Sequence, residues 1–295
     1  MRNNTEGFNF KKNNFDLLRL LAAMQVAFVH GVEHFDISMP EMLMLIVKAF
    51  PGVPIFFVIS GFLISASYER SPSLRTYTTN RLLRIYPALW ACLAVSILVV
   101  LLSYDINTTF FDAISWLAAQ MTIGQFYNPD FLRGYGVGTL NGSLWTIPVE
   151  LQFYLALPII YWLIKNLKIT NVGLGVCIIL LATFNQFFHL DLKNQETVFI
   201  KLLGVSLLPH LYMFLFGVFL QRNQGLVHKI LAGKAFYWLL ALVLGNSAFM
   251  YFGITFQGNS INPISSSILS LLTISLAYTQ TDKLSKILRG NDISY

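Results

Sequence analysis

The stretch FDLLRLLAAMQVAFVHGVEHFD at residues 15–36 is the first long apolar run of the 295-residue chain, and it decides the class of fold. A helix needs roughly 20 predominantly apolar residues to cross the hydrocarbon core of a bilayer, which is about 30 Å thick. The run includes Asp16 and Arg19, and no small-residue cleavage pattern follows it. We therefore predict a retained transmembrane helix rather than a removable signal peptide, preceded by a polar cytoplasmic tail at residues 1–14.

Further apolar runs of this length follow along the whole chain. Charged residues make up only 12% of all residues, about half of their share in a soluble domain. A weaker run at 112–125 is too short to cross and suits a re-entrant or interfacial helix. The sequence therefore predicts an all-α, polytopic integral membrane helix bundle with about eight transmembrane helices, in a single membrane-embedded domain over 1–295. The expected spans are 15–36, 50–68, 85–104, 144–164, 172–189, 202–221, 235–254 and 262–279.

The distribution of Lys and Arg predicts the orientation. With eight spans and a cytoplasmic N-terminus, the inner segments hold 15 of the 20 basic residues, whereas a ninth span at 112–125 would distribute them almost evenly. The eight-span arrangement therefore follows the positive-inside rule. The net charge of +6 is spread between apolar runs, and no soluble basic domain is left to bind nucleic acid.

The first predicted span carries an unusual density of ionisable residues, which are costly inside a membrane and normally face a cavity or a partner. The eleven-residue step from Arg19 to His30 is within about 20° of three full helical turns, so both side chains share one face, separated by roughly 16 Å. Arg19 would lie near the cytoplasmic side and His30 in the outer half of the membrane. Two simpler roles stay open: Arg19 could reach headgroup phosphates, and His30 could be a core histidine with satisfied hydrogen bonds.

Other charged residues are expected to complete a site. Glu150 lies about six residues into the fourth span, at a depth similar to that of His30, and a buried carboxylate needs a partner. It could bind His30, or it could only join two helices. Arg81 and Arg84 lie three residues apart at the expected start of the third span, in an inner loop at 69–84. They could form a phosphate clamp or serve only as an orientation signal.

The sequence HGVEH at 30–34 also matches the H-x-x-E-H pattern of some zinc proteases. A zinc site would need a third ligand from another helix, either Glu150 or His210. The pattern is short and weakly specific, so we predict no metal. Cys92 and Cys177 lie inside apolar runs and are expected to be packing residues.

The blocks of sequence, in this order, resemble acyltransferase family 3, the membrane O-acyltransferases that modify bacterial surface polysaccharides. The first span is similar to the family's Arg-x10-His motif, with Arg19 and His30 in its two positions. Glu150 falls on the motif glutamate, although 146–148 departs slightly from the usual residues. The other similar blocks are FFVISGFLIS at 56–65, RLLRIYP at 81–87, LWTIPVELQFY at 144–154 and MFLFGVFL at 213–220.

This resemblance implies an O-acetyltransferase of the bacterial inner membrane. Its donor would be acetyl-CoA or another acyl-CoA, and its acceptor a hydroxyl of a surface glycan or lipid-linked sugar, with no permanently bound cofactor. Catalysis would involve His30, Glu150 and Arg19, with Arg81 and Arg84 on the CoA phosphates. It also implies ten helices, and since NDISY at 291–295 looks like the start of the penultimate one, we expect a C-terminally truncated chain.

Two other kinds of protein fit the same residues. A transporter or channel subunit could use intramembrane Arg, His and Glu as a pathway for protons or substrate. A truncated chain without catalytic activity could persist as a scaffold.

Overall fold

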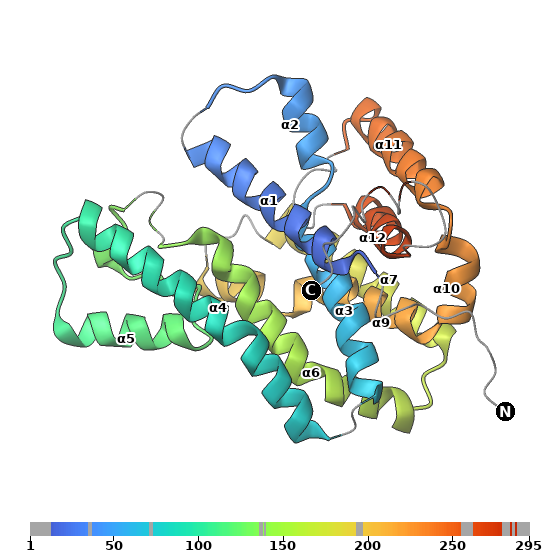
Figure 1. Cartoon of the computed structure of the whole chain (residues 1–295), viewed down its shortest axis with the longest axis horizontal. Helices are drawn as coiled ribbons and strands as arrows, with labels where there is room; N and C mark the ends of the chain where they lie inside the picture. The colour runs from blue at the N-terminus through green and yellow to red at the C-terminus, as the bar shows by residue number, and fades with distance from the viewer. Residues whose placement is uncertain are drawn as a thin grey trace.

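The computed structural model describes residues 13–34, 37–70, 73–135, 138, 140–192, 197–254, 262–278, 284 and 287. Within these ranges every regular element is helical, which confirms the all-α prediction (Figure 1). Residues 1–12 of the expected tail and the 291–295 segment lie outside the described residues. The main helices are α1 (Phe15–His34), α2 (Glu41–Lys48), α3 (Gly52–Arg70), α4 (Leu74–Ser103), α5 (Phe110–Met121), α6 (Thr146–Asn166), α7 (Asn171–Phe187), α8 (Val198–Gly204), α9 (Leu211–Arg222), α10 (Gln224–Leu231), α11 (Ala235–Tyr251) and α12 (Pro263–Ala277).

The described helices are long and apolar enough for a multi-pass membrane protein. Five helical segments could each cross a bilayer, and the number rises to seven if the bent pairs α8–α9 and α10–α11 each form one span. Each of the eight runs predicted from the sequence coincides with a helix, but α12 has only 15 residues, so length alone does not establish eight crossings. The run predicted at 112–125 lies partly in the 12-residue α5 (Phe110–Met121), and residues 122–125 follow that helix.

The arginine-containing loop expected at 69–84 is mostly helix, which corrects that prediction. Helix α4 starts at Leu74, eleven residues before the predicted span, and Ser73 caps it by accepting a hydrogen bond from the backbone N–H of Thr76. Arg81 and Arg84 therefore lie within α4 rather than at its start. A hydropathy criterion misses this segment because a helix that extends beyond the apolar layer can carry charges.

Helices α3 and α9 form the centre of the molecule, where their backbones approach closely at two glycines. A Cβ on Gly61 would collide with the backbone carbonyl of Phe214, and a Cβ on Gly217 would lie 2.7 Å from the backbone nitrogen of Phe62. Small residues allow this kind of close contact between membrane helices. Beside the glycines, the rings of Phe57 and Phe214 stack with centroids 4.5 Å apart.

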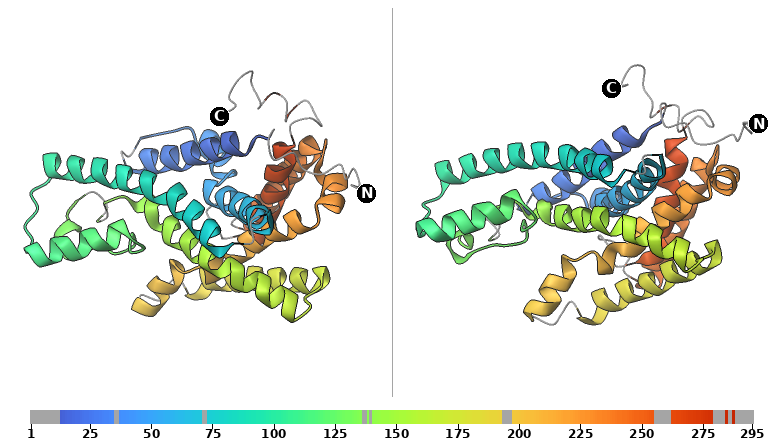
Figure 2. Two further views of the ribbon diagram at one scale, coloured as in Figure 1. Left: turned by 60° about the horizontal axis from the view of Figure 1, so that its bottom comes forward. Right: turned by 90° about the horizontal axis from the view of Figure 1, so that it is seen from below.

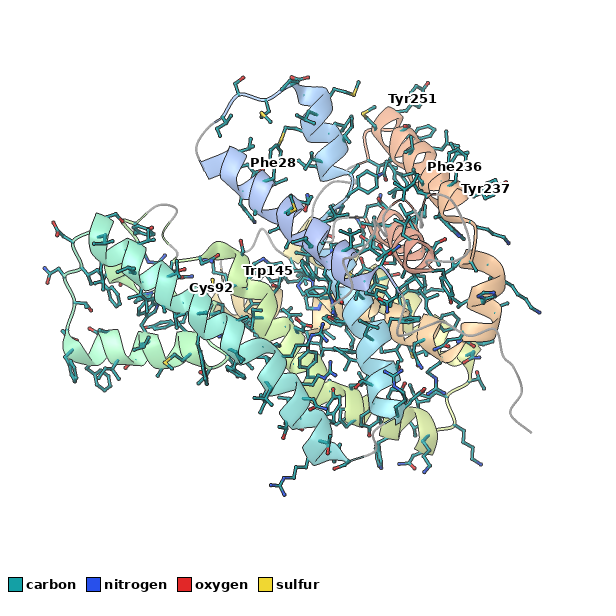
Figure 3. All side chains as sticks on the ribbon, viewed as in Figure 1. Phe28, Cys92, Trp145, Phe236, Tyr237 and Tyr251 are labelled. Carbon is teal, nitrogen blue, oxygen red and sulfur yellow. The ribbon has the colours of Figure 1, made fainter. Side chains whose placement is uncertain are left out.

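The other helices surround this central pair. Helix α1 packs on α3, and α12 packs on α11 and α3. Helices α4 and α5 extend away from the centre on one side, as all three views show (Figures 1 and 2). Outward-facing aromatic side chains follow α11, where Phe236, Tyr237 and Tyr251 are all more than 60% exposed (Figure 3). This exposure suits contact with lipid and with the membrane interface.

The apolar span that ends in α9 is broken between Gly204 and Leu208, with a bend of 40°. A break exposes backbone groups that need partners, because a bilayer offers them no water. Gln152 of α6 supplies them: its Oε1 accepts from the N–H of Leu207 at 2.8 Å, and its Nε2 donates to the carbonyl of Val205 at 3.4 Å. The helix that carries Glu150 thus also stabilises the break.

Candidate active site

Glu150 is held by two hydroxyl groups in the interior of the bundle. Its Oε1 accepts hydrogen bonds from Ser60 of α3 at 2.7 Å and from Tyr154, one turn further along α6, at 2.5 Å. The expected alternative, that Glu150 joins helices through hydrogen bonds, describes this contact with α3.

Arg19 interacts electrostatically with this carboxylate and with the exposed Arg84, and Arg81 lies over the ring of Tyr154. We call Arg19, Arg81 and Arg84 the guanidinium cluster. Arg19 interacts electrostatically with Arg84, Glu150, Tyr154 and Asp16. Arg81 donates to Ser67 at 3.2 Å and lies over the ring of Tyr154 at 6.0 Å. The sequence named all three arginines, and the structure brings them together from α1 and α4.

The guanidinium cluster has donors that the described residues leave unused. Nη1 of Arg19 and Nε of Arg81 are both buried without a hydrogen-bond partner among the described residues. Arg19 interacts with two described carboxylates, Glu150 and Asp16, whereas the cluster carries three positive charges. Unpaired buried donors are costly, and guanidinium groups bind phosphate in a bidentate manner. The cluster is therefore chemically suited to an anionic ligand such as a phosphate.

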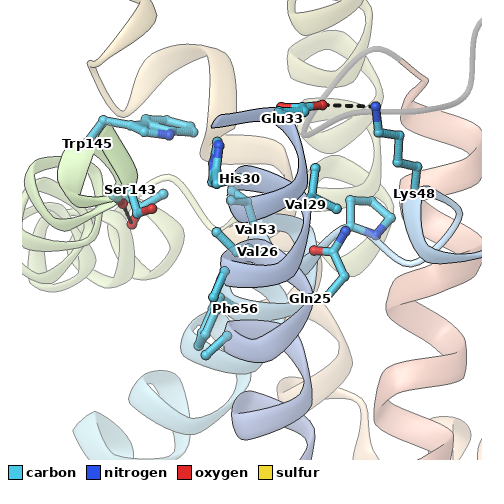
Figure 4. A pocket seen from close by; sticks show the side chains of 14 residues that line it. Gln25, Val26, Val29, His30, Glu33, Lys48, Val53, Phe56, Ser143 and Trp145 are labelled. Atoms are coloured by element: carbon cyan, nitrogen blue, oxygen red, sulfur yellow. Dashed lines mark hydrogen bonds and ion pairs between the residues drawn. The ribbon is translucent and has the colours of Figure 1, made fainter. Parts of the chain in front are cut away.

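His30 lies in a separate pocket of about 630 Å³, which we call the His30 pocket (Figure 4). Three groups of residues line it: one face of α1, the end of α2 with the start of α3, and the short helix Gly142–Trp145 that precedes α6. The residues are Ala23, Gln25, Val26, Ala27, Val29, His30, Glu33, Lys48, Pro51, Val53, Phe56, Ser143, Trp145 and Thr146.

The His30 pocket follows the face of α1 that leads toward Arg19. From His30 it runs over Val26 to Ala23, at helical steps of three or four residues, and Arg19 is one further turn along. Because α1 is a continuous helix from Phe15 to His34, His30 and Arg19 are about 16 Å apart along its axis. The face shared by the two residues therefore borders both polar regions.

The expected pairing of Glu150 with His30 is not what the structure shows. Glu150 is bound by Ser60 and Tyr154 and does not line the His30 pocket. His30 makes no hydrogen bond with any described residue. Ser143 and Trp145 line the same pocket on the side of His30 (Figure 4).

Glu33 of the H-x-x-E-H pattern and His210, one of the two possible third zinc ligands, have other partners. Glu33 forms an ion pair with Lys48 at 2.9 Å, and His210 contacts the carbonyl of Gly204 through Nε2 at 3.0 Å. The side chain of His34 is outside the described residues. Among the side chains that are described, no three His, Cys, Asp or Glu residues lie close enough to hold a metal ion.

Sequence reasoning missed several residues of the two sites. Tyr154 follows Glu150 by four residues, so helical spacing could have identified it as a neighbour. Ser60 lies in the FFVISGFLIS block, but nothing in that block indicates which helix it faces. Trp145 and Lys48 come from the segments flanking α6 and α3, and only the folded chain brings them to His30.

An apolar bundle with charged residues gathered in its interior defines a polytopic membrane protein with an internal polar site. Residues 12–295 match the acyltransferase domain of acyltransferase family 3. The chain therefore belongs to acyltransferase family 3, which confirms the resemblance seen in its sequence and the expected enzyme class, an O-acetyltransferase.

Curated relatives agree with this assignment. The chain is 33% identical to nodulation protein 10 of Rhizobium leguminosarum bv. viciae, over 96% of this chain and 80% of that protein. It is 34% identical to the O-acetyl transferase of Shigella phage Sf6, over 54% of this chain and 48% of the relative. It is also 28% identical to the peptidoglycan O-acetyltransferase OatA of Listeria monocytogenes serovar 1/2a, over 43% of this chain and 23% of the relative.

The aligned regions span most of the first relative, but only about half of the second and less than a quarter of the third. No solved structure matches the chain.

Proposed function

We propose that this protein transfers an acetyl group from acetyl-CoA, or a related acyl group from acyl-CoA, to a hydroxyl of an exported or cell-surface glycan. The observation that carries this proposal is the arrangement along α1. One helix face borders the guanidinium cluster at Arg19 and a ligand-sized pocket at His30, about 16 Å apart.

The donor would enter at the guanidinium cluster. Arg81, Arg84 and Arg19 bring three positive charges, and the unused donors of Arg19 and Arg81 suit the phosphates of CoA. The pantetheine arm would then extend along the α1 face, past Ala23 and Val26, and place the thioester near His30. Glu150 would orient Arg19 and offset part of the positive charge.

His30 would supply the proton-transfer chemistry. A neutral imidazole, with an ordinary pKa near 6.5, can accept the proton of a sugar hydroxyl at neutral pH. The sugar oxygen then attacks the thioester carbon, the carbon–sulfur bond breaks, and the proton passes to the CoA sulfur. In the second route that we retain, an imidazole nitrogen of His30 attacks the thioester carbon, the carbon–sulfur bond breaks and CoA leaves as the thiol. The sugar oxygen then attacks the acyl carbon, the bond to the imidazole nitrogen breaks, and the imidazole takes the hydroxyl proton.

The acceptor would meet His30 from the outer side of the bacterial inner membrane, with the N-terminus in the cytoplasm. This orientation is supported by the basic residues of the predicted inner segments. It would let a cytoplasmic donor acylate a glycan on the opposite side of the membrane. A lipid-linked sugar could reach His30 from the same side of the membrane.

His30→Ala is the direct test, because a placed general base contributes about 10²–10⁴-fold to a rate. We expect the variant to insert and fold like the wild type, yet to lose acyl transfer by at least 10²-fold. Purified protein in proteoliposomes would be assayed for consumption of acetyl-CoA and for acetylated glycan by mass spectrometry. Wild-type transfer by the variant would remove His30 from the mechanism. Substrate flux without consumption of acetyl-CoA would instead indicate a transporter.

The phosphate clamp needs a separate comparison. Arg84→Ala should weaken acyl-CoA binding. Arg75→Ala, at the start of the same helix α4, should leave the binding close to the wild-type value. Binding of acetyl-CoA to the detergent-solubilised protein measures both. Equal effects of the two substitutions would show that the arginines of α4 only set the topology.

A further inference from the structure

The wall of the His30 pocket opposite α1 is formed by the short helix Gly142–Trp145, and its largest side chain is Trp145. Trp145 is partly buried and packs against the main core. Its ring contacts the ring of His210, with centroids 5.2 Å apart, and His210 is only 2% exposed. The core and the buried His210 therefore hold the Trp145 ring in place, and the ring is directed into the pocket beside His30 (Figure 4).

Several polar groups of the His30 pocket have no partner of their own. The indole Nε1 of Trp145, the hydroxyl of Ser143 and the ring nitrogens of His30 make no hydrogen bond with any described residue. These groups can donate to a ligand and accept from it. An aromatic surface surrounded by a few such groups is typical of a small-molecule site, and the volume of about 630 Å³ lies within the usual range of about 300–1,000 Å³.

The permanent charges of the described lining residues are balanced. Among those residues, Glu33 and Lys48 carry permanent charges, and they form an ion pair with each other at 2.9 Å. Each therefore already has the other as its partner. A carboxylate brought into the pocket would therefore lose water without gaining a cation, which is unfavourable.

We infer that Trp145 is the platform on which a neutral sugar ring of the acceptor stacks, with the hydroxyl to be acylated directed at His30. The C–H groups of one face of a pyranose ring are apolar and slightly positive, so they pack favourably on the negative face of an indole. Ser143 and the indole N–H would bind hydroxyls at the edge of the sugar. This inference rests on the proposed acyl transfer to a glycan, and it narrows the acceptor to uncharged sugars.

Substitutions at Trp145 test the platform. Purified protein would be assayed with acetyl-CoA and a panel of neutral probes, methyl β-D-glucoside and methyl N-acetyl-β-D-glucosaminide. We expect Trp145→Leu to raise KM for the neutral probes about tenfold, the effect of a lost aromatic contact of about 1.4 kcal/mol, with kcat close to the wild-type value. Trp145→Phe should restore most of the affinity, because it keeps a flat ring. Trp162→Leu is the matched control, since Trp162 lies on α6 but is 61% exposed, away from the pocket.

Binding without chemistry gives a second readout. Saturation-transfer NMR in detergent should show both neutral glycosides bound to the wild type and to His30→Ala, and much weaker binding to Trp145→Leu. If the wild type binds none of the neutral glycosides, or if Trp145→Leu binds them as the wild type does, the platform is overturned.

The charge balance has its own test with methyl β-D-glucuronide. Glu33→Gln leaves Lys48 without its anionic partner, so this variant should accept the glucuronide at least tenfold better than the wild type does. Glu41→Gln, on the exposed start of α2, is the control and should not. A wild type that prefers the glucuronide to the neutral probes would overturn the assignment to uncharged sugars.

The outcomes separate this inference from the proposed function. If His30→Ala abolishes transfer while Trp145→Leu leaves KM unchanged, the acyltransferase mechanism stands and the platform is wrong. If the wild type binds neutral glycosides through Trp145 but consumes no acetyl-CoA, the sugar site stands and the proposed acyl transfer is wrong.

Discussion

One oxygen of Glu150 accepts hydrogen bonds from two hydroxyl groups, while the charge of the carboxylate acts on Arg19. Substitutions can therefore test the hydrogen bonds and the charge separately. Glu150→Gln keeps a carbonyl oxygen for Ser60 and Tyr154 but removes the negative charge beside Arg19. We expect a protein that folds like the wild type and whose acyl transfer falls at least tenfold, because Arg19 loses its counter-charge. Thermal unfolding in detergent and acetyl-CoA consumption measure the two effects.

The matched variant is Glu150→Ala, which removes the acceptor as well as the charge. Leaving a buried hydroxyl without a partner costs about 1–3 kcal/mol, so this variant should also unfold at a lower temperature. If Glu150→Gln and Glu150→Ala unfold at the same temperature, the hydrogen bonds to Ser60 and Tyr154 do not stabilise the fold.

At the scale of single residues, the sequence indicated the chemically important side chains but not their partners. Arg19, His30 and Glu150 stand out because ionisable groups are rare within apolar helices. The sequence places Glu150 at the depth of His30, but depth does not say which neighbour a helix faces. That choice depends on how α3 and α6 pack, and in the structure Ser60 occupies the position beside Glu150.

The close contact between α3 and α9 leads to a prediction about packing. Gly61→Ala and Gly217→Ala each introduce a methyl group against backbone atoms, which cannot move aside as a side chain can. Overpacking costs about 1–3 kcal/mol, so both variants should unfold at lower temperatures and give less folded protein. Gly175→Ala is the control, because a Cβ there meets nothing within 4 Å. Unfolding of Gly61→Ala at the wild-type temperature would contradict the observed contact.

The break between α8 and α9 is the second element whose stability depends on a single side chain. Gln152→Leu is similar in size but removes the acceptor for the N–H of Leu207 and the donor to Val205. We expect a loss of about 1–3 kcal/mol in the free energy of unfolding. Increased hydrogen exchange at residues 204–208, measured by mass spectrometry, locates the effect. Gln152→Glu keeps an acceptor for the N–H of Leu207. The amide of Leu207 should therefore exchange more slowly in Gln152→Glu than in Gln152→Leu.

Apolar runs predicted where helices occur more reliably than where they begin. All eight runs correspond to helices, since a segment without water must satisfy its backbone internally. The start of α4 at Leu74 was missed because Arg75, Arg81 and Arg84 lower the hydropathy of a segment that is nonetheless helical. The break after Gly204 was also missed, because the residue that stabilises it, Gln152, belongs to another helix.

For the whole molecule, the orientation is a prediction that single cysteines can test. In a Cys92→Ser, Cys177→Ser background, Asn107→Cys should react with a membrane-impermeant maleimide in intact spheroplasts. Lys165→Cys should react only after the membrane is permeabilised, because the loop after α6 is expected on the cytoplasmic side. Asn107 and Lys165 are both exposed in the structure. The reverse labelling pattern would place the His30 pocket on the cytoplasmic side and exclude a glycan acceptor outside.

The length of α4 has a consequence for the lipids around the enzyme. Its 30 residues extend about 45 Å, well beyond an apolar layer of about 30 Å. With the predicted orientation, the segment that carries Arg81 and the exposed Arg84 would lie among the lipid headgroups. Phosphatidylglycerol and cardiolipin carry phosphate groups there, as CoA does. Anionic bilayers should therefore compete with the donor, and the apparent KM for acetyl-CoA should rise with the fraction of phosphatidylglycerol in the vesicle.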